Sequence, residues 1–463
     1  MDHLKVYNPY SQQEIASIPR LSENEVETAI AKAYDLYKNR SRHLAKHERI
    51  AILGRLKNLM EEGREDLCRI ATTEGGKPWM DSMVEVDRAI NGVGLAIDHL
   101  SRMHGDEIPM GQTASSTGRM AMTFIEPIGV VSAISAFNHP LNLIVHQVIP
   151  AFAVGAPVLI KPASSTPLTC INFHELMIEA GVPADWCQVL ITSQQWAEKL
   201  VTDHRIAFLS FIGSAEVGWS LRSKLNPGAA CALEHGGVAP VIVCEDADPN
   251  DILAPILKGG FYHAGQVCVS VQKVFVPEGF AEDFASKLAK ATSSLQVGNP
   301  LDPKTEVGPL ISTAELERVD QWVHDSVAQG AELLCGGRKV SETCYAPTVL
   351  LNPPDRADVS KHEVFGPVVC VYSYSSLDQA INTANALPFK FQAAVFTNDI
   401  NTMFDCVKRI KAKAVMVNDH TAFRVDWMPF GGGETSGIGV GGIPHSMDEM
   451  SSKKLMVIKS SSL

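Results

Sequence analysis

Residues 128–163 read IGVVSAISAFNHPLNLIVHQVIPAFAVGAPVLIKPA. The apolar runs IGVVSAIS (128–135) and PVLIKPA (157–163) each predict a strand, and LNLIVHQVIPAFAVG between them predicts a helix. Both strands are continuous apolar runs, which is typical of strands that are covered on both faces. A strand, a helix and a second strand of these lengths form a βαβ unit, so the segment predicts a parallel sheet.

The same alternation continues toward the C-terminus. In this first series, further strands are expected at 187–192, 206–213 and 231–234, with helices at 166–181, 195–203 and 215–225. A second series begins near residue 236, with strands expected at 240–244, 269–276, 345–351, 367–374, 391–397 and 414–418 and helices at 250–265, 280–295 and 314–330. Residues 24–64 also show helical periodicity. The sequence therefore predicts two α/β units in succession.

Two peripheral segments have a different pattern. Residues 118–127 (GRMAMTFIEP) and 454–461 (KLMVIKSS) alternate between apolar and polar residues, as a strand with two different faces does. Peripheral strands of this kind need an edge to pair with, and a second subunit can supply one.

Composition excludes several classes of protein. The chain has 463 residues and a formal net charge of −12, which argues against a nucleic-acid partner. No apolar run reaches the roughly 18 residues of a membrane span. The N-terminus lacks the basic and apolar regions of a signal peptide. We therefore expect a soluble, cytoplasmic protein with no membrane partner.

The ten cysteines form no CxxC pair and have no zinc-finger spacing with histidines, so no metal site is predicted. Most should be small buried residues with free thiols. Cys268, in YHAGQVCVS, is a candidate nucleophile because it follows a glycine-rich helix end where a substrate can approach the backbone. Its backbone N–H would supply half of an oxyanion hole. The alternative is that Cys268 also fills the core.

Other polar residues stand where predicted strands end, and open α/β sheets bind ligands there. Asn138 could donate to the same oxyanion, or it could belong to a turn. Glu234 precedes two glycines and would be a partly desolvated general base, or a paired structural residue. Lys161 could hold a ribose or phosphate, or it could simply be solvated. Ser214 opens a helix whose N–H groups favour phosphate, although no GxGxxG precedes this helix.

In this order, the motifs FNHPLNL, LIKPAS, FIGSAEVG, LEHGG, GQVC, EVFGPV and PFGG resemble those of the aldehyde dehydrogenase superfamily over nearly the whole chain. The resemblance implies a Rossmann-like cofactor domain, an α/β catalytic domain and a β-strand oligomerisation arm. It implies that Cys268 attacks the aldehyde, that Asn138 helps to hold the oxyanion and that Glu234 activates water to hydrolyse the thioester. It places NAD or NADP beside Phe137, Lys161, Ser164, Gly213, Ser214, Glu363 and Phe365.

The resemblance also sets the expected boundaries. The cofactor-binding domain would comprise 1–105 and 127–235, the catalytic domain 236–430, and the arm 106–126 and 431–463. Family members usually form dimers or tetramers, so we expect a homodimer or homotetramer. The presence of Glu234 favours hydrolysis over transfer to coenzyme A. A catalytically silent relative and a cysteine hydrolase that pairs Cys268 with His263 are the alternatives.

Three positions depart from the family pattern. Ser164 stands where many NAD-dependent members have glutamate, and without that charge we expect NADP to be accepted or preferred. TSQQW (192–196) replaces a turn that usually contains glycine, and Glu434 replaces a common lysine. We give the last change no functional interpretation.

Three residues bear on the substrate. Arg88, His139 and Arg424 match positions that contribute to anion sites in branches acting on phosphorylated or phosphonate aldehydes, and arginine binds such groups bidentately. Each could instead be structural: Arg88 near Glu85, or Arg424 with Asp426. Val267 stands where those branches often have arginine. The expected substrate is therefore a small anionic or hydroxylated aldehyde, such as phosphonoacetaldehyde, sulfoacetaldehyde or lactaldehyde, and the alternative is a general semialdehyde or alkanal dehydrogenase.

Overall fold

The computed structural model describes residues 2–463. The segment quoted above forms β5 (Val130–Ile134), α5 (Asn142–Val154) and β6 (Val158–Lys161), and the two strands pair in parallel. They lie in the middle of a six-stranded sheet of order β19-β9-β8-β5-β6-β7. Its other strands are β7 (Cys187–Val189), β8 (Ile206–Ile212), β9 (Ala230–Glu234) and β19 (Gly437–Ile438). The predicted parallel sheet is confirmed, and β19 adds an antiparallel edge.

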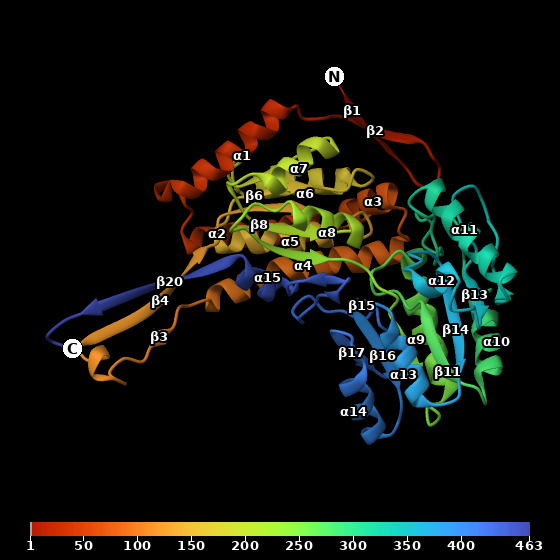
Figure 1. The fold of residues 1–463 in the computed structure, drawn as a ribbon. Coiled ribbons are helices and arrows are strands. Elements are labelled where there is room, and N and C mark those ends of the chain that lie inside the picture. Colours follow the sequence, from red (N-terminus) through yellow and green to blue (C-terminus); the bar gives the residue numbers. More distant parts are fainter. Residues whose placement is uncertain (1) are drawn as a thin grey trace.

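Helices cover both faces of this sheet (Figure 1). Val130 and Leu159 pack with α1 on one face, whereas Val131 and Val158 pack with α5 on the other. Since each strand alternates between two apolar layers, its sequence is apolar throughout. The surrounding helices are α1 (Glu23–Lys38), α2 (Lys46–Glu62), α3 (Arg64–Gly75), α4 (Trp79–Arg102), α6 (Pro167–Glu179), α7 (Gln194–Thr202), α8 (Ala215–Ser223) and α15 (Ile443–Glu449).

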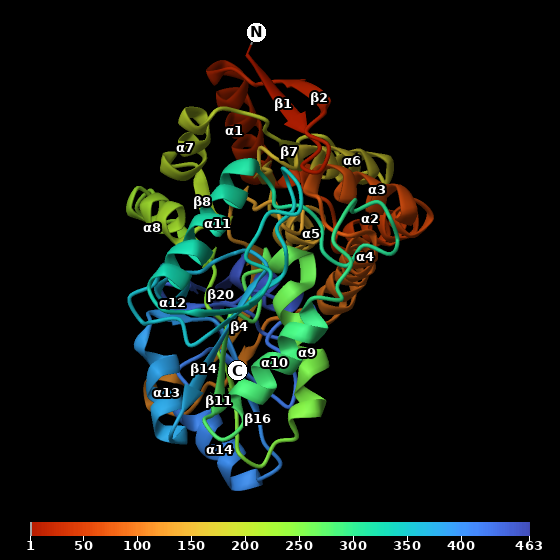
Figure 2. The same ribbon diagram turned by 90° about the vertical axis from the view of Figure 1, so that its right-hand side faces the viewer.

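A second sheet, of seven strands, has the order β12-β13-β14-β11-β10-β16-β17. Its strands are β10 (Val241–Val243), β11 (Lys273–Pro277), β12 (Glu332–Cys335), β13 (Thr348–Leu351), β14 (Val368–Tyr374), β16 (Gln392–Phe396) and β17 (Ala414–Val417). Its helices are α9 (Pro249–Phe261), α10 (Ala281–Thr292), α11 (Thr313–Ala328), α12 (Asp358–Lys361), α13 (Leu377–Ala386) and α14 (Ile400–Arg409). Figure 2 shows this unit below the first one. Its core is a separate apolar cluster.

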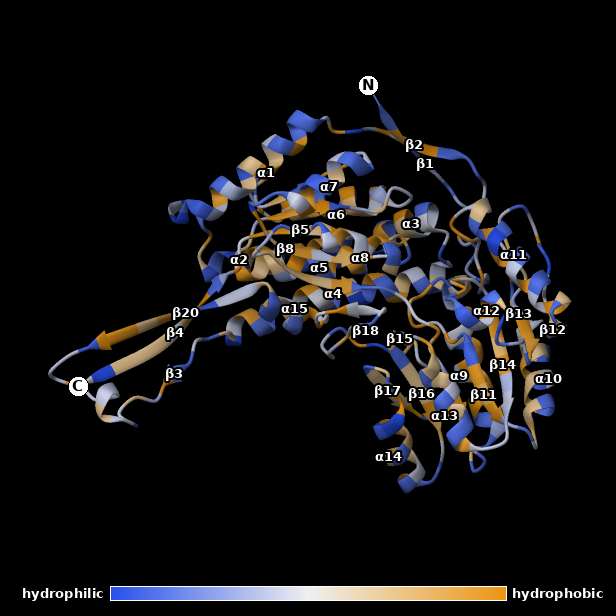
Figure 3. Ribbon diagram, in the orientation of Figure 1, coloured by the Kyte–Doolittle hydropathy of each residue, from blue (hydrophilic) through white to orange (hydrophobic). Residues whose placement is uncertain are grey.

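A three-stranded sheet extends away from the body (Figure 1). It consists of β3 (Glu107–Ile108), β4 (Arg119–Pro127) and β20 (Ser451–Lys459), so both predicted peripheral strands are confirmed and they pair with each other. Apolar residues lie along them (Figure 3), and Leu455 is 56% exposed. Within the segment 431–463, which was predicted to belong to the arm, β19 pairs with β9 and α15 packs on α4 and α5.

Several strand positions differ from expectation. The hairpin of β1 (His3–Tyr7) and β2 (Glu14–Pro19) and the edge strand β12 were not predicted, because their sequences have few buried residues. The strand expected at 269–276 begins only at Lys273. The residues before it form a loop. Among the described residues, no helix is long and apolar enough to cross a bilayer.

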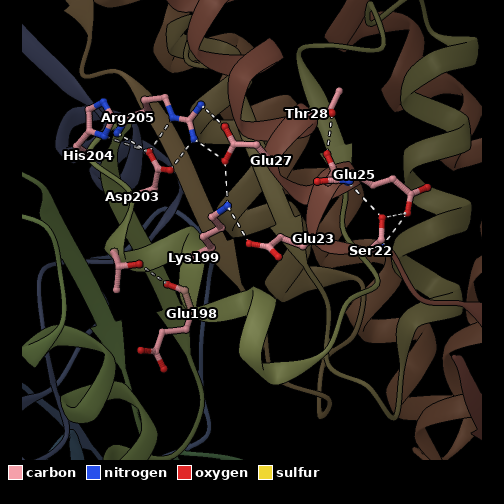
Figure 4. A network of polar contacts seen from close by, with 12 residues as sticks. Ser22, Glu23, Glu25, Glu27, Thr28, Glu198, Lys199, Asp203, His204 and Arg205 are labelled. Atoms are coloured by element: carbon pink, nitrogen blue, oxygen red, sulfur yellow. Dashed lines mark hydrogen bonds and ion pairs between the residues drawn. The ribbon is translucent and has the colours of Figure 1, made fainter.

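The N-terminal helix is joined to the first sheet by a polar network (Figure 4). Ser22 and Glu25 form a capping box at the start of α1. Glu27 of α1 accepts hydrogen bonds from Lys199 of α7 and from Arg205, just before β8. Exposed ion pairs contribute about 0–1 kcal/mol each, so this network mainly fixes how α1 sits on the sheet.

Candidate active site

A cavity of about 640 Å³ is lined by residues of both α/β units. On one side are residues that follow the carboxyl ends of β5, β8 and β9, where open α/β sheets bind ligands. On the other side are the loop before β11 and segments near 311–315, 363–365 and 422–430. The predicted residues Cys268, Glu234 and Asn138 all line this cavity. Residues far apart in the sequence therefore meet as expected.

A sharp turn presents Cys268. After α9 the chain makes a 3-10 turn (Tyr262–Gly265) in which His263 and Ala264 have φ values of 48° and 54°. Gly265 also has positive φ, and a Cβ there would collide with the carbonyl oxygen of Gly366. The flanking Val267 and Val269 are buried, while Cys268 is partly exposed. Buried neighbours fix the loop and leave the thiol accessible, as a nucleophile requires.

The Asn138 side chain is fixed beside this loop. It is 5% exposed, and its Nδ2 donates to the carbonyl oxygen of Gln266 at 3.0 Å. The Gln266 side chain donates to the Pro309 carbonyl and accepts from the Ile311 N–H, which anchors the loop to the second unit. Because an amide nitrogen carries two N–H bonds, Asn138 retains one that can donate to a ligand oxygen.

Glu234 is the last residue of β9. Burial raises the pKa of its carboxyl to about 7, the charge of Arg424 opposes this rise, and the charge of Glu449 adds to it. A Cβ on Gly441 would collide with the Glu234 carboxylate, so a larger residue there would displace this side chain. A carboxylate with this pKa can accept a proton near neutral pH.

The Cys268 thiol holds its proton at neutral pH. Burial raises its pKa to about 12, and the charges of Glu234 and Glu363 add to this effect, while Arg424 opposes it. A thiol with so high a pKa becomes a nucleophile only when a base takes its proton or when a nearby positive charge lowers its pKa. Glu234 lines the same cavity and has the pKa of such a base.

Five of the predicted cofactor residues line the cavity: Phe137, Gly213, Ser214, Glu363 and Phe365. The Oε1 atom of Glu363 accepts from the Gly237 N–H at 3.1 Å. Phe365, with φ of 47°, packs edge-on against Phe137 at 5.9 Å. Ser214 precedes α8, whose first N–H groups can bind phosphate. These residues fit a nicotinamide dinucleotide. Glu363 offers a carboxylate for ribose hydroxyls, the start of α8 offers N–H donors for phosphate, and the two phenylalanines offer aromatic walls.

Lys161 and Ser164 lie outside the lining of this cavity. Lys161 ends β6 with its Nζ 3.3 Å from the Pro162 carbonyl, and Ser164 is exposed. Burial lowers the Lys161 pKa, and the charge of Arg20 lowers it further, so the two cations are close. Arg20 was not predicted, since nothing in its sequence position points to this end of β6. TSQQW lies nearby, and the Thr192 carbonyl accepts from Arg20 at 3.1 Å.

The predicted anion-binding residues have different partners. Arg88 donates two hydrogen bonds to Asp426, at 2.7 and 3.1 Å, and not to the neighbours considered in the sequence. Asp426 also accepts from His146 at 2.7 Å. Arg424 lies over the Phe430 ring with its Nη1 buried and without a partner among the described residues. The Nε of Arg424 lies 3.8 Å from Asp426, so the pairing considered in the sequence is present in the structure. Arg424 thus shares this carboxylate with Arg88 and has one buried N–H group unpaired, whereas Arg88 donates to Asp426 twice.

His139 lines the cavity, and His263 lies behind it without lining the cavity. His139 hydrogen-bonds the Tyr262 hydroxyl at 2.9 Å and lies edge-on to the ring of His263. Neither ring nitrogen of His263 has a partner among the described residues, and burial lowers its pKa well below the usual range. No Cys268–His263 hydrogen bond is therefore formed, which argues against a cysteine hydrolase. Residues 2–463 contain no group of three potential metal ligands.

Fold and cavity define a two-unit α/β protein with its site at the strand ends. The sequence model of the aldehyde dehydrogenase family matches residues 1–456. The chain is 36% identical to a 3-sulfolactaldehyde dehydrogenase of Priestia aryabhattai, covering 99% of this chain and 95% of the relative. It is also 36% identical to a lactaldehyde dehydrogenase of Methanocaldococcus jannaschii, and this match covers 99% of this chain and 97% of the relative.

Solved structures agree with this comparison. Aldehyde dehydrogenase 21 from Physcomitrella patens, in complex with the reaction product succinate, has a TM-score of 0.95 at 32% identity and covers 99% of this chain and 95% of its own. Glyceraldehyde-3-phosphate dehydrogenase GapN from M. jannaschii, complexed with NADP, has a TM-score of 0.94 at 35% identity. This match covers 99% of this chain and 100% of the GapN chain. The chain belongs to the aldehyde dehydrogenase family, and it is an NAD(P)-dependent aldehyde dehydrogenase.

Proposed function

We propose that the chain oxidises a small anionic, hydroxylated aldehyde to its carboxylic acid through a thioester on Cys268. The Cys268 sulfur, after Glu234 takes its proton, bonds to the aldehyde carbon. The carbonyl oxygen becomes an oxyanion that accepts hydrogen bonds from the Asn138 amide and the Cys268 N–H. Removing one such donor typically slows a reaction by about 10²–10³-fold.

The bound nicotinamide supplies the acceptor for the hydride that leaves the aldehyde carbon. After releasing the Cys268 proton to solvent, Glu234 takes a proton from water, whose oxygen attacks the thioester carbon and displaces the Cys268 sulfur as a thiolate. Glu363 holds the cofactor ribose, and the aromatic pair Phe137 and Phe365 confines the ring. The pKa of Glu234, raised to about 7 by burial, supports its role as base in both proton transfers.

The observation that carries the substrate proposal is the cation Arg424, which lines the cavity, lies 3.8 Å from Asp426 and has a buried Nη1 without a partner among the described residues. A buried guanidinium nitrogen without a partner is costly, and a sulfonate, phosphonate or carboxylate can satisfy it. His139 and Tyr262 line the same wall and can contact a hydroxyl. Relatives named for sulfolactaldehyde, lactaldehyde and a succinate product support a substrate of three or four carbons.

The second candidate is an uncharged hydroxyaldehyde such as lactaldehyde. Asp426 engages Arg88, and Val267 leaves the position before Cys268 uncharged. Among the described residues that line the pocket, Arg424 is then the cation with the fewest protein partners, which favours a singly charged or neutral substrate over a phosphate ester. A general alkanal dehydrogenase would leave Arg424 unexplained.

We also propose that NADP is accepted and preferred. Ser164 adds no negative charge beside Lys161, and Arg20 adds a second cation to that end of the site. A 2′-phosphate is stabilised by such cations, whereas a glutamate would repel it. Neighbours complexed with NADP are consistent with this assignment.

The assembly is proposed to be a homodimer or homotetramer joined through the sheet of β3, β4 and β20. Phe124 and Leu455 of this sheet are 45% and 56% exposed, and a partner subunit would cover them. Hydrodynamic mass measurement tests this proposal. A cytoplasmic location remains a prediction of the sequence.

The test of function is formation of NAD(P)H, followed at 340 nm. Substrates would include sulfolactaldehyde, sulfoacetaldehyde, phosphonoacetaldehyde, succinate semialdehyde, lactaldehyde and an uncharged alkanal. We expect anionic members to have the highest kcat/KM, and Arg424→Gln to reduce that advantage by about tenfold or more. Arg356→Gln, at an exposed arginine away from the site, is the matched control. Equal rates with the alkanal, unaffected by Arg424→Gln, would contradict an anion pocket.

A further inference from the structure

A second cavity, of about 20 Å³, lies behind Glu234 and shares that side chain with the active-site cavity. A space of this size holds about one water molecule. Its lining includes Gln147, Ser446 and Glu449, none of which lines the larger cavity. The catalytic carboxylate thus separates two spaces, one for substrate and one that leads away from it.

The small cavity is polar on two sides. Gln147 donates through Nε2 to the carbonyl oxygens of Ile134 and Ser210, but its Oε1 is buried with no partner among the described residues. A buried acceptor of this kind requires a donor, and a water or a protonated carboxyl group supplies one. Gln147 is therefore placed to orient a proton donor beside Glu234.

Glu449 closes the other side. It is the last residue of α15, and its Oε1 accepts from the Val440 N–H at 2.8 Å. No described residue donates to its Oε2. The side chain is partly exposed, so it reaches solvent while it lines the cavity. Burial raises its pKa, and the Val440 hydrogen bond opposes the rise.

No other group on this cavity can perform the same task. His146 lines it, but the Nε2 of that ring is hydrogen-bonded to Asp426 and burial lowers its pKa. Of the charged groups near Glu234, Arg424 holds a permanent positive charge and Cys268 is the proposed nucleophile. Glu449 is the remaining carboxylate on this cavity with access to solvent.

We propose that Glu449 is a proton-relay residue that takes the catalytic proton from Glu234 through one water in the small cavity and releases it to solvent. This inference rests on the proposed function, in which Glu234 gains a proton when water attacks the thioester. The Glu234 O–H donates its proton to the water oxygen, and that water passes one of its own protons to the Glu449 carboxylate. Glu234 is thereby restored as a carboxylate, and no electrons are transferred.

The relay is tested with Glu449→Gln, which keeps an oxygen for the Val440 N–H but cannot carry a proton as a carboxylate does. Glu449→Asp is the conservative variant, and Asp448→Asn, at the exposed neighbouring carboxylate, is the matched control. Three quantities are measured for each: single-turnover NAD(P)H formation, the decay of acyl-enzyme by quenched mass spectrometry, and kcat against pH. Thermal melting and cofactor binding report whether each variant is folded.

We expect Glu449→Gln to leave single-turnover NAD(P)H formation unchanged while slowing acyl-enzyme decay by about tenfold. Added imidazole or formate should restore part of the lost rate in proportion to its concentration. Asp448→Asn should behave as wild type, and Glu449→Asp should retain part of the activity. The acid limb of the kcat profile should move to lower pH in Glu449→Gln, since a negative charge that raises the Glu234 pKa is removed.

Decay of the acyl-enzyme at the wild-type rate in Glu449→Gln would overturn the relay. So would slowing of hydride transfer and of acyl-enzyme decay by the same factor, if added imidazole or formate did not restore either rate. If Glu449→Gln does not fold, Glu449→Asp provides the test. The relay would be overturned if Glu449→Asp had the wild-type pH profile and the wild-type rate of acyl-enzyme decay, and if added base did not change that rate. Failure of the proposed function looks different. In that case wild-type protein itself forms no NAD(P)H and no acyl-enzyme with any aldehyde of the panel.

Discussion

The guanidinium of Arg88 and the carboxylate of Asp426 form a two-point hydrogen-bonded pair, although 338 residues separate them in the chain. Asp426 is 2% exposed and also accepts from His146. This pair joins α4 to the loop that carries Arg424. We therefore expect Arg88 to act on stability and on the position of that loop, and Arg424 to act on the substrate.

Replacing Arg88 with glutamine should lower the free energy of unfolding by about 3–5 kcal/mol, because a buried carboxylate loses its partner. Burial alone would raise the Asp426 pKa, but hydrogen bonds from His146 and Arg88 hold it well below its usual range. Since the folded-state pKa is depressed, the stabilisation is present above the unfolded-state pKa of about 3.9 and is lost as pH falls below it. Urea titrations at pH 7 and pH 3 measure the difference between wild type and variant.

That difference should shrink at pH 3. Lys57→Gln, which removes an exposed ion pair with Glu61 on α2, is the control and should change stability by less than about 1 kcal/mol. A loss of substrate affinity in Arg88→Gln without any loss of stability would instead show that Arg88 contacts the substrate.

Replacing Glu234 with glutamine should slow turnover by about 10²–10⁴-fold, the usual contribution of a general base. Acyl-enzyme should accumulate on Cys268 and be visible by mass spectrometry. In wild type, burial raises the Glu234 pKa to about 7, and only the carboxylate accepts a proton, so deacylation should fall as pH drops through about 7. Unimpaired turnover in Glu234→Gln without an adduct would exclude this role.

Much of the fold could be predicted because parallel strands covered on both faces leave long apolar runs. Val130 to Ile134 and Val158 to Lys161 were located in this way. The start of β11 was misplaced because VSVQ has the pattern of a strand. In the structure the Ser270 hydroxyl bonds the carbonyls of Gly259 and Gly260, which holds that segment as a loop. Such long-range contacts leave no periodic signal.

The candidate site, like the fold, could be predicted in part from the sequence. Strand-end positions indicated Glu234 and Asn138, and a glycine-rich helix end indicated Cys268, because the fold brings strand ends together and the loop before β11 faces them. The sequence could not show that Arg88 is bound by Asp426, since a charge pair across 338 residues has no local pattern. Nor could it show Glu449, whose position depends on how α15 packs against α4 and α5. Partners of buried charges are set by tertiary packing.

Replacing Cys268 with alanine should abolish aldehyde oxidation while leaving cofactor binding and thermal stability unchanged. Burial raises the thiol pKa to about 12, so iodoacetamide should modify Cys268 slowly at pH 7 and faster as pH rises. Peptide mass spectrometry follows each cysteine separately. The half-buried thiol of Cys231 serves as the internal comparison. Full activity in Cys268→Ala would end the thioester mechanism.

Replacing Ser164 with glutamate should shift preference from NADP toward NAD. The new carboxylate would repel a 2′-phosphate beside Lys161 and could accept from the 2′-hydroxyl of NAD. A tenfold fall in the ratio of kcat/KM for NADP to that for NAD corresponds to about 1.4 kcal/mol, a modest interaction between neighbouring charges. Steady-state kinetics with each cofactor at a fixed aldehyde concentration measure the ratio.

Two further variants separate charge from shape at this position. Ser164→Ala removes the hydroxyl without adding charge, so it should lower NADP affinity only slightly. Arg20→Gln removes the second cation and should weaken NADP binding while leaving NAD binding almost unchanged, because only NADP carries the 2′-phosphate. The effect of Arg20→Gln should decrease at high salt, since ions screen a partly exposed charge. An unchanged ratio in both Ser164→Glu and Arg20→Gln would show that the 2′-phosphate is bound elsewhere.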